Sequence, residues 1–395
     1  MANNNENKVL NVPHLRFPEF SGEWEKNNLS KFSSKITKKN KSNFINNVLC
    51  NSANLGIIPQ NDYFDRDIAN ADNTDSYYII EQGDFVYNPR KSTAAPYGPV
   101  NIYNGEKPGI ISPLYLCFSV FNISPSFLFY RFKSSVWHPY VYSHGDTGVR
   151  YDRVSIKDDV FFDMPIYTPT QNEQEKIATL LSLIDERIAT QNKIIEDLKK
   201  LKSAIVDKLY SSTNGKTYSF CQLFEVVNEK NKKLAYKNVL SASQELGMIE
   251  RSNINIDIKF EQESISGYKI VRKGDYVVHL RSFQGGFAFS DTTGICSPAY
   301  TILRPNDLVV YGYLSHFFTS KPFIKSLKLV TYGIRDGRSI NVDEWLDMPI
   351  LLPSAQEQMR ILTIVNAIDA KLHNEAKVQF CLSSQKSYLL NTMFI

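Results

Sequence analysis

Cysteine is scarce in this chain of 395 residues, and its placement excludes the usual structural uses of the residue. The five cysteines lie far apart, at positions 50, 117, 221, 296 and 381. No two of them have the short spacing of zinc ligands, and an odd number argues against the disulfide framework of a secreted protein. The sequence therefore predicts neither a structural zinc site nor a cross-linked secreted domain.

Long apolar runs and a strong net charge are also missing. The most apolar stretch, residues 109–130, is interrupted by Pro113, Asn122 and Pro125, so we interpret it as a buried strand, a turn and a helix start rather than a membrane span. The first eight residues are polar, unlike a secretory signal. A net charge of +4 permits a nucleic-acid partner without requiring one. These features predict a cytoplasmic protein of two or three domains, with no membrane partner.

Motifs of catalysis are absent or incomplete. The sequence has no Gly-x-Gly-x-x-Gly after a strand and no phosphate-binding P-loop. Asn88-Pro89 resembles the start of the Asn-Pro-Pro-aromatic motif of amino-methyltransferases, but Arg90-Lys91 follows it, and the matching position of the repeat described below reads His279-Leu280. We therefore expect no catalytic residue and no metal ligand. A methyltransferase or nuclease site of unrecognised type is the alternative.

The sequence does contain one long helix, present twice. In the first copy, Thr170 and Glu173 have the spacing of a capping box, and apolar residues then recur at alternating steps of four and three to about Tyr210. This period of 3.5 residues is typical of a helix that coils around a partner. The apolar positions are Ile177, Leu181, Ile184, Ile188, Ile195, Leu198 and Ile205, with polar breaks at Gln191 and Lys202.

The second copy begins 184 residues later, with Ser354 and Glu357 as its capping box. Its apolar positions are Ile361, Val365, Ile368, Leu372, Leu382 and Leu389, and its polar breaks are Glu375 and Lys386. We predict that the two helices pair with each other as an antiparallel intramolecular coiled coil. Gln191 and Glu375 would then set its register or face a partner subunit.

The segments that precede the two helices are also copies of each other. The matches include Tyr77 to Arg90 with Tyr268 to Arg281, and Asp163-Met164-Pro165-Ile166 with Asp347-Met348-Pro349-Ile350. A repeat of this length indicates a tandem duplication rather than a solenoid. We predict an α+β protein with pseudo-two-fold symmetry and two duplicated mixed α/β domains. The predicted parts are an N-terminal tail (1–23), a first domain (24–166), a first long helix (167–213), a second domain (214–350) and a second long helix (351–395).

The loops of both domains carry polar and basic residues at equivalent places. Arg, Lys, Ser, Thr and Gln are the side chains that bind phosphates and base edges, and arginine binds guanine through two hydrogen bonds. Ordinary solvated loops are the alternative, which recurrence in two divergent domains disfavours for the arginines. Lysine-rich runs at residues 31–41 and 230–237 fit either interpretation. The candidate DNA-binding residues are Arg90, Lys91, Ser92, Thr93, Arg150, Tyr151 and Arg153 in the first domain, and Arg281, Ser282, Phe283, Gln284, Arg335, Asp336 and Arg338 in the second.

The whole layout resembles the specificity subunit of type I restriction–modification systems. The resemblance rests on the repeat order, on the opening Leu15-Arg16-Phe17-Pro18-Glu19-Phe20 through Gly22-Glu23-Trp24, and on the second helix lead-in, Asp347-Met348-Pro349-Ile350 with Gln356-Glu357-Gln358. The first lead-in departs slightly, because it reads Asn172-Glu173-Gln174.

The resemblance implies a non-catalytic subunit that recognises double-stranded DNA. Each globular unit would be a target-recognition domain for one half of a bipartite sequence. The helices would set the spacer and dock two methyltransferase subunits, with Gln191, Lys202, Glu375 and Lys386 as the first residues to test for that contact. Restriction subunits complete such complexes. S-adenosylmethionine, ATP and magnesium would be used by the partner subunits, and this chain would bind no cofactor. A coiled-coil scaffold without sequence-specific DNA binding is a further alternative.

Overall fold

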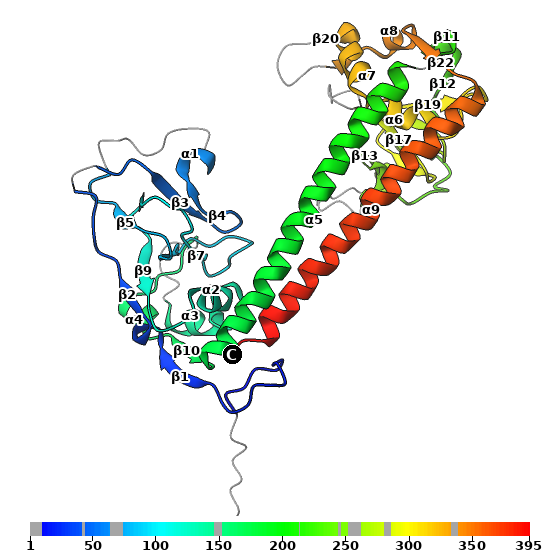
Figure 1. Ribbon diagram of the computed structural model, residues 1–395. Helices are drawn as coiled ribbons and strands as arrows, with labels where there is room; N and C mark the ends of the chain where they lie inside the picture. Colours follow the sequence, from blue (N-terminus) through cyan, green and yellow to red (C-terminus); the bar gives the residue numbers. More distant parts are fainter. Residues whose placement is uncertain are drawn as a thin grey trace, which may run out of the picture. The chain divides into compact units, whose positions relative to one another are not determined.

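The structure, a computed structural model, describes residues 10–41, 44–63, 74–145, 152–212, 214–243, 246–251, 262–279, 286–332 and 339–395. The chain divides into two units, each of which contains a globular domain and a part of both long helices (Figure 1). Unit 1 comprises Met1–Gln191 and Val378–Ile395, and unit 2 comprises Asn192–Lys377. No helix within the described ranges is both long and apolar enough to cross a bilayer.

The two long helices, α5 (Gln171–Ser211) and α9 (Ala355–Thr392), lie where the heptad pattern predicts them. Their predicted capping boxes form only in part. Ser354 Oγ accepts a hydrogen bond from the Glu357 N–H at 3.4 Å, but the Glu357 carboxylate binds Arg360 instead of reaching back. In the first copy Glu173 likewise binds other partners, Arg16 and Trp24. The reciprocal box is therefore wrong for both glutamates, because a guanidinium is a stronger donor than a backbone amide.

Within each unit the segments of α5 and α9 run antiparallel, and each unit contains the same ion pair between them. In unit 1, Asp185 binds Lys386 at 2.5 Å. In unit 2, Lys202 binds Asp369, also at 2.5 Å. The 184-residue repeat relates Asp185 to Asp369 and Lys202 to Lys386, so the two pairs are copies. Both lysine breaks in the apolar seam therefore have partners inside the chain, which fixes the register of each helix pair.

The predicted apolar seam faces inward in both units. Gln191 is also buried, and Glu375 is half-buried beside Lys371, whose ammonium it binds at 2.5 Å. Of the apolar positions, those that are buried are Ile177, Leu181, Ile184, Ile361, Val365, Leu382 and Leu389, and those that are half-buried are Ile188, Ile195, Leu198, Ile205, Ile368 and Leu372.

The domain of unit 1 consists of two four-stranded sheets with short helices. One sheet has the order β2-β9-β6-β7, and the other has the order β4-β3-β8-β5, in which only β3 and β8 are parallel. The elements are β1 (Glu25–Asn28), η1 (Leu29–Lys31), β2 (Ser33–Lys35), β3 (Val48–Ser52), β4 (Gly56–Pro59), α1 (Gln60–Tyr63), β5 (Tyr78–Ile80), β6 (Phe85–Tyr87), β7 (Val100–Ile102), β8 (Gly109–Ile111), β9 (Leu116–Val120), α2 (Pro125–Lys133), α3 (His138–His144), α4 (Asp158–Phe162) and β10 (Pro165–Thr168).

The domain of unit 2 repeats this topology. Its first sheet has the order β12-β19-β16-β17, and the pairs β13-β14 and β15-β18 correspond to the second sheet, with a parallel bridge between Val239 and Ile295. The elements are β11 (Lys216–Ser219), η3 (Phe220–Gln222), β12 (Phe224–Val227), β13 (Leu240–Ser243), β14 (Gly247–Glu250), η5 (Gln262–Gly267), β15 (Lys269–Val271), β16 (Tyr276–Val278), β17 (Phe287–Phe289), β18 (Gly294–Cys296), β19 (Thr301–Pro305), α6 (Tyr313–Phe317), α7 (Lys321–Ser326), η6 (Leu327–Val330), β20 (Thr331–Tyr332), β21 (Ser339–Ile340), α8 (Val342–Leu346) and β22 (Pro349–Leu352).

The apolar stretch 109–130 contains one strand more than the sequence predicts. It forms two strands, β8 and β9, because Ser112-Pro113 makes a turn between them, in which Ser112 O accepts from Tyr115 N. The predicted helix start is confirmed as that of α2, with Ser124 as its N-cap and Pro125 in its first turn.

The repeated Asp-Met-Pro-Ile segment ties the two ends of each domain together. It leads into β10 and β22, which pair antiparallel with the first strand of their own domain, β1 or β11. The same backbone hydrogen bond follows in both, from Leu29 N to Met164 O and from Phe220 N to Met348 O. The chain therefore enters each domain and leaves it at one place, directly before a long helix.

A buried glutamine then attaches each helix to its domain. Gln174 accepts a hydrogen bond from Ser124 N at 2.9 Å and donates one to Pro169 O at 3.0 Å. Its repeat equivalent, Gln358, accepts from Val310 N at 2.8 Å and donates to Pro353 O at 3.0 Å. Both side chains are almost fully buried. Since a buried amide costs free energy unless it is bonded, these contacts fix each helix against its domain.

Candidate nucleic-acid interface

The structure brings together three candidate residues of the first domain that lie far apart in the sequence. Arg90 follows β6 and forms an antiparallel backbone bridge with Arg153. Two hydrogen bonds extend the bridge, from Lys91 N to Asp152 O at 2.8 Å and from Val154 N to Pro89 O at 2.9 Å. Arg90, Lys91 and Arg153 therefore share one short ribbon, which we name the arginine ribbon.

The arginine ribbon is a concentration of positive charge. Arg90 is exposed, and Lys91 and Arg153 are half-buried. Within the described part of the chain, none of the three side chains forms an ion pair, and Arg153 Nε is buried without a hydrogen-bond acceptor. Two guanidinium groups on neighbouring strands repel each other unless an anion lies between them. The ribbon is thus suited to bind a negatively charged or acceptor-rich ligand.

Three neighbouring residues shape the backbone. Asn88 donates to Asn51 O at 3.2 Å and accepts from Arg90 N at 3.0 Å, so its amide holds the ribbon and is not available to a target base. Ser92 Oγ accepts from Ala95 N at 3.1 Å and closes a turn, with Thr93 exposed at its tip. Gly98 has φ +84° and lies so close to Asn88 O that a Cβ would be 2.1 Å away, so only glycine fits there.

An aromatic pocket of about 260 Å³ adjoins the arginine ribbon. Tyr115 lines it together with Tyr78, Pro89 and Val154, and the Lys35–Asp158 ion pair lies at its edge. Burial raises the pKa of the Tyr115 hydroxyl, and the nearby guanidinium groups of the ribbon oppose that shift. The pocket combines aromatic faces with cations, the two kinds of group that contact nucleic acids.

Sequence analysis missed Tyr115, although a signal for it exists. Ser112-Pro113-x-Tyr115 recurs as Ser297-Pro298-x-Tyr300, and in both copies the serine O accepts from the tyrosine N at 3.1 Å. Tyr300 packs against the ring of His279, 5.1 Å away, at the end of β16. Each domain therefore holds a tyrosine beside the strand end where its candidate basic residues begin.

The remaining candidates lie outside the described residues, so the structure does not test them. They are Arg150 and Tyr151 in the first domain and Arg281, Ser282, Phe283, Gln284, Arg335, Asp336 and Arg338 in the second.

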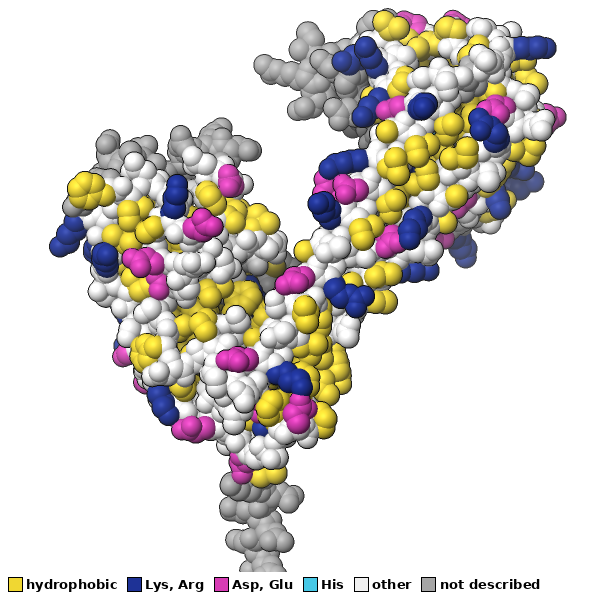
Figure 2. Space-filling model, viewed as in Figure 1, with side chains coloured by type: hydrophobic (Ala, Val, Ile, Leu, Met, Phe, Trp, Pro, Cys, Tyr) yellow, Lys and Arg dark blue, Asp and Glu magenta, His cyan; other side chains and the backbone are white. Residues whose placement is uncertain are grey.

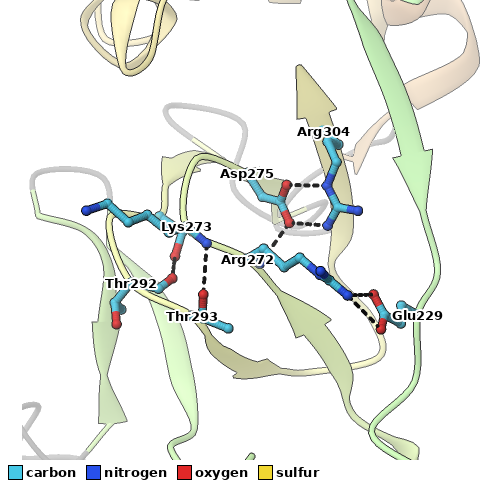
Figure 3. Close-up of polar contacts among 8 residues, drawn as sticks. Glu229, Arg272, Lys273, Asp275, Thr292, Thr293 and Arg304 are labelled. Atoms are coloured by element: carbon cyan, nitrogen blue, oxygen red, sulfur yellow. Dashed lines mark hydrogen bonds and ion pairs between the residues drawn. The ribbon is translucent and has the colours of Figure 1, made fainter. Parts of the chain in front are cut away.

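A Gly-Asp pair directly precedes the equivalent strands β6 and β16, as Gly83-Asp84 and Gly274-Asp275, and it has a structural function. Asp275 is buried, accepts from Arg272 N at 2.8 Å and binds Arg304 through two hydrogen bonds of 2.9 Å (Figure 3). Asp84 makes the same turn by accepting from Glu81 N at 2.7 Å, but Ser119 stands where Arg304 does, and burial raises the pKa of Asp84. Both aspartates therefore shape the turn that leads to the candidate site.

In the ranges that the structure describes, no three His, Cys, Asp or Glu side chains gather as a metal ion requires. Basic and acidic side chains alternate over the face shown in Figure 2, while apolar side chains are exposed along the long helices. The exposed apolar residues of the helices are Leu183, Ile194, Leu201, Met359, Val378, Phe380 and Tyr388.

Comparison with known proteins identifies the fold. No family model matches the sequence, and no curated protein matches it. A chain from a study of complex assembly and conformational transition of the type I R-M system matches with a TM-score of 0.60 at 13% identity, over 94% of this chain and 97% of that one. The S subunit of a type I restriction–modification system from M. genitalium matches with a TM-score of 0.53 at 14% identity, over 97% of this chain and 99% of that one.

The chain has the fold of a type I specificity subunit. The likeness extends over both domains and both helices of the two structures, and it agrees with the internal duplication. The predicted specificity-subunit fold, with two mixed α/β domains and two long antiparallel helices, is thus confirmed.

Proposed function

We propose that this chain is the DNA-recognition subunit of a type I restriction–modification complex in the cytoplasm. The observation that carries the proposal is the duplication of one complete unit, in which a domain is fixed to a long helix by the same contacts in both copies. Two equivalent readers on one chain suit a bipartite target on one duplex. The specificity-subunit fold supports the same conclusion.

Chemistry would belong to partner subunits. The candidate site offers cations, aromatic rings and backbone groups, which recognise DNA but do not transfer a methyl group. Two methyltransferase subunits would dock on the long helices, whose exposed apolar residues are not used by the seam between the helices. S-adenosylmethionine, ATP and magnesium would be used by these subunits and by the restriction subunits.

The proposal is tested by mapping modified bases in the host genome with and without this gene. We expect that one bipartite sequence loses its modification when the gene is deleted and regains it on complementation. The purified chain, incubated alone with DNA and labelled S-adenosylmethionine, should incorporate no methyl group. Incorporation without a partner would favour an enzyme, and an unchanged pattern of modified bases would favour a scaffold.

Arg90 is expected to read a base. Arg90→Lys keeps the positive charge but loses the planar group that binds a base edge through two hydrogen bonds. Discrimination between the target and a one-base variant should fall by about 1–3 kcal/mol, with little change in binding to unrelated DNA. Competition binding with the assembled complex measures both quantities, and Lys91→Arg is the matched control. A uniform loss on every duplex would assign Arg90 to a phosphate instead.

The long helices are expected to set the spacer of the target. Seven residues inserted after Asn192 and after Ala376, which are equivalent positions of the repeat, keep the seam in phase. The helix pair then lengthens by about 10 Å, or about three base pairs. Modification mapping should show a longer spacer or, where the half-sites fall out of phase, no modification. An unchanged spacer contradicts this role, and insertion into α5 alone is the control that breaks the seam.

A further inference from the structure

A buried asparagine closes a lysine-bearing loop at the same place in each domain. Asn40 donates to Ile45 O at 3.0 Å and accepts from Ile45 N at 3.3 Å. Asn231 donates to Tyr236 O at 2.8 Å and accepts from Tyr236 N at 3.2 Å. Their side chains are only 3% and 1% exposed, so each asparagine is an internal clasp rather than a surface residue.

The backbone that carries each asparagine is an edge of a sheet. Ile79 N donates to Lys38 O and Asn40 N donates to Tyr77 O, so Lys39 is bridged to Tyr78 of β5. In unit 2, Ile270 N donates to Glu229 O and Asn231 N to Tyr268 O, so Lys230 is bridged to Lys269 of β15. The two arrangements are copies, down to the donor and acceptor of each bond.

The geometry of such a strand decides where the lysines point. Because neighbouring side chains on an extended strand point to opposite faces, an inward asparagine requires outward neighbours. Lys39 and Lys230 precede the asparagines on the bridged strand and point outward for this reason, whereas Lys41 and Lys232 follow the asparagines in the turn. All four are exposed. Among the described residues, none of the four has an ion-pair partner. In unit 2, the Arg272–Glu229 ion pair fixes the strand directly before Lys230 (Figure 3).

In the first domain, the lysine pair lies on the same side as the candidate base-reading residues. Tyr78, which pairs with Lys39, lines the aromatic pocket together with Pro89 and Val154, the neighbours of Arg90 and Arg153. In unit 2, the Lys269 ammonium donates to Tyr300 O at 2.7 Å, and Tyr300 packs on His279. Cations on a fixed backbone beside a reading face are the arrangement that DNA-binding domains use for phosphate contacts.

We propose that Lys39, Lys41, Lys230 and Lys232 bind the phosphate backbone of duplex DNA, with one lysine pair on each half of the target. The assignment rests on the proposed recognition function and extends it to named residues. Ammonium groups on flexible stems bind phosphates as point charges and read no base. The lysine pairs thus supply affinity and orientation, while the arginine ribbon supplies discrimination.

The salt dependence of DNA binding tests the proposal. The variant K39Q/K41Q/K230Q/K232Q, purified as the full chain with its methyltransferase subunits, is compared with wild type on target and unrelated duplexes by fluorescence anisotropy. Each phosphate contact contributes about 0.9 to the slope of log K against log salt, so four contacts contribute about 3.6. We expect the slope to fall by up to that amount and affinity to fall roughly tenfold or more on both duplexes. The ratio of target to unrelated affinity should stay unchanged.

Two matched variants complete the design. Lys→Arg at the same four positions keeps the charge and should keep the slope. Lys→Gln at four exposed lysines elsewhere in the domains, Lys107, Lys216, Lys325 and Lys328, makes the same change of net charge and should reduce the slope far less.

The outcomes separate this proposal from the function on which it rests. An unchanged slope with wild-type discrimination overturns the lysine contacts and leaves DNA recognition intact. Lost discrimination at an unchanged slope overturns them too, because the lysines would then read bases. Loss of the methyltransferase from the purified complex, with an unchanged slope for the free chain, would show that they bind an acidic protein surface instead. A wild-type complex without sequence preference refutes the proposed function. In that case, the difference in salt slope between wild type and the lysine variant on unrelated duplex still tests the phosphate contacts.

Discussion

Arg16→Met should destabilise the protein by about 3–5 kcal/mol, the cost of leaving a buried carboxylate without its cation. Glu173 is 0% exposed at the start of α5, and Arg16 Nε and Nη2 both bind it at 2.7 Å. Trp24 Nε1 adds a longer bond of 3.3 Å, which cannot replace a guanidinium. Chemical denaturation followed by circular dichroism measures the loss.

The chain offers two controls for this prediction. Lys176→Met removes the partner of Glu19 in an exposed ion pair and should have little effect on stability. Arg360→Met removes the cation that binds Glu357, the repeat equivalent of Glu173, and should also have little effect because that pair is exposed. The double variant Arg16→Met/Glu173→Leu should recover much of the lost stability. A single Arg16→Met variant within about 1 kcal/mol of wild type would contradict the argument.

The same ion pair shows why the N-terminal segment is part of the fold. Besides Arg16 and Glu173, Leu15 N donates to Thr392 O near the end of α9, and Lys176 lies 4.7 Å from the ring of Phe17. The predicted N-terminal tail thus joins the first turn of α5 to the last turn of α9 within unit 1. Loss of Arg16 would loosen this junction.

Local patterns were enough to predict the long helices and the duplicated domains. A 3.5-residue period needs only the positions of apolar residues, and two copies of it in one chain predict their own partner. The Asp-Met-Pro-Ile segment is identical in the two copies. The structure shows its function, because it leads into β10 and β22, which pair with the first strand of their own domain.

Long-range contacts could not be predicted in this way. Glu173 has the spacing of a capping glutamate, yet its strongest partner lies 157 residues earlier in the chain. In the sequence, Lys202 only interrupts an apolar seam, and the structure shows that Asp369 lies beside it as its ion-pair partner. Asn40 and Asn231 read as members of polar loops, because the sequence does not show that their side chains turn inward. In each case a polar residue looks solvated in sequence and has a buried or interhelical function in space.

For the candidate site, the sequence predicts which types of residue are present better than it predicts which of them lie close together. Arg90 and Arg153 belong to two separate loops of the sequence, and the structure joins them in one ribbon. Ser92 has the chemistry of a contact residue, whereas its hydroxyl closes the turn with Ala95. Tyr115 is half-buried, and only its position beside the ribbon marks it as a site residue.

Replacing the first domain with a copy of the second should make the modified sequence symmetric. The structure supplies the junctions, because Leu29 N binds Met164 O where Phe220 N binds Met348 O. A chain in which residues 220–348 replace residues 29–164 keeps β1, β10 and both long helices. In it the grafted Val310 N meets Gln174 as Ser124 N does now, so the graft is held by an existing contact.

The expected target of this chimera consists of two copies of the half-site read by the second domain. Because each domain is fixed in the same way to antiparallel helices, the two copies should be inverted relative to each other. The reciprocal chimera, with residues 29–164 in place of 220–348, should give the other symmetric sequence, and modification mapping in a host without this gene reads out both. If either folded chimera still modifies the original asymmetric sequence, the two domains are not independent readers. If one exchange alters both halves, recognition is shared between the domains rather than divided.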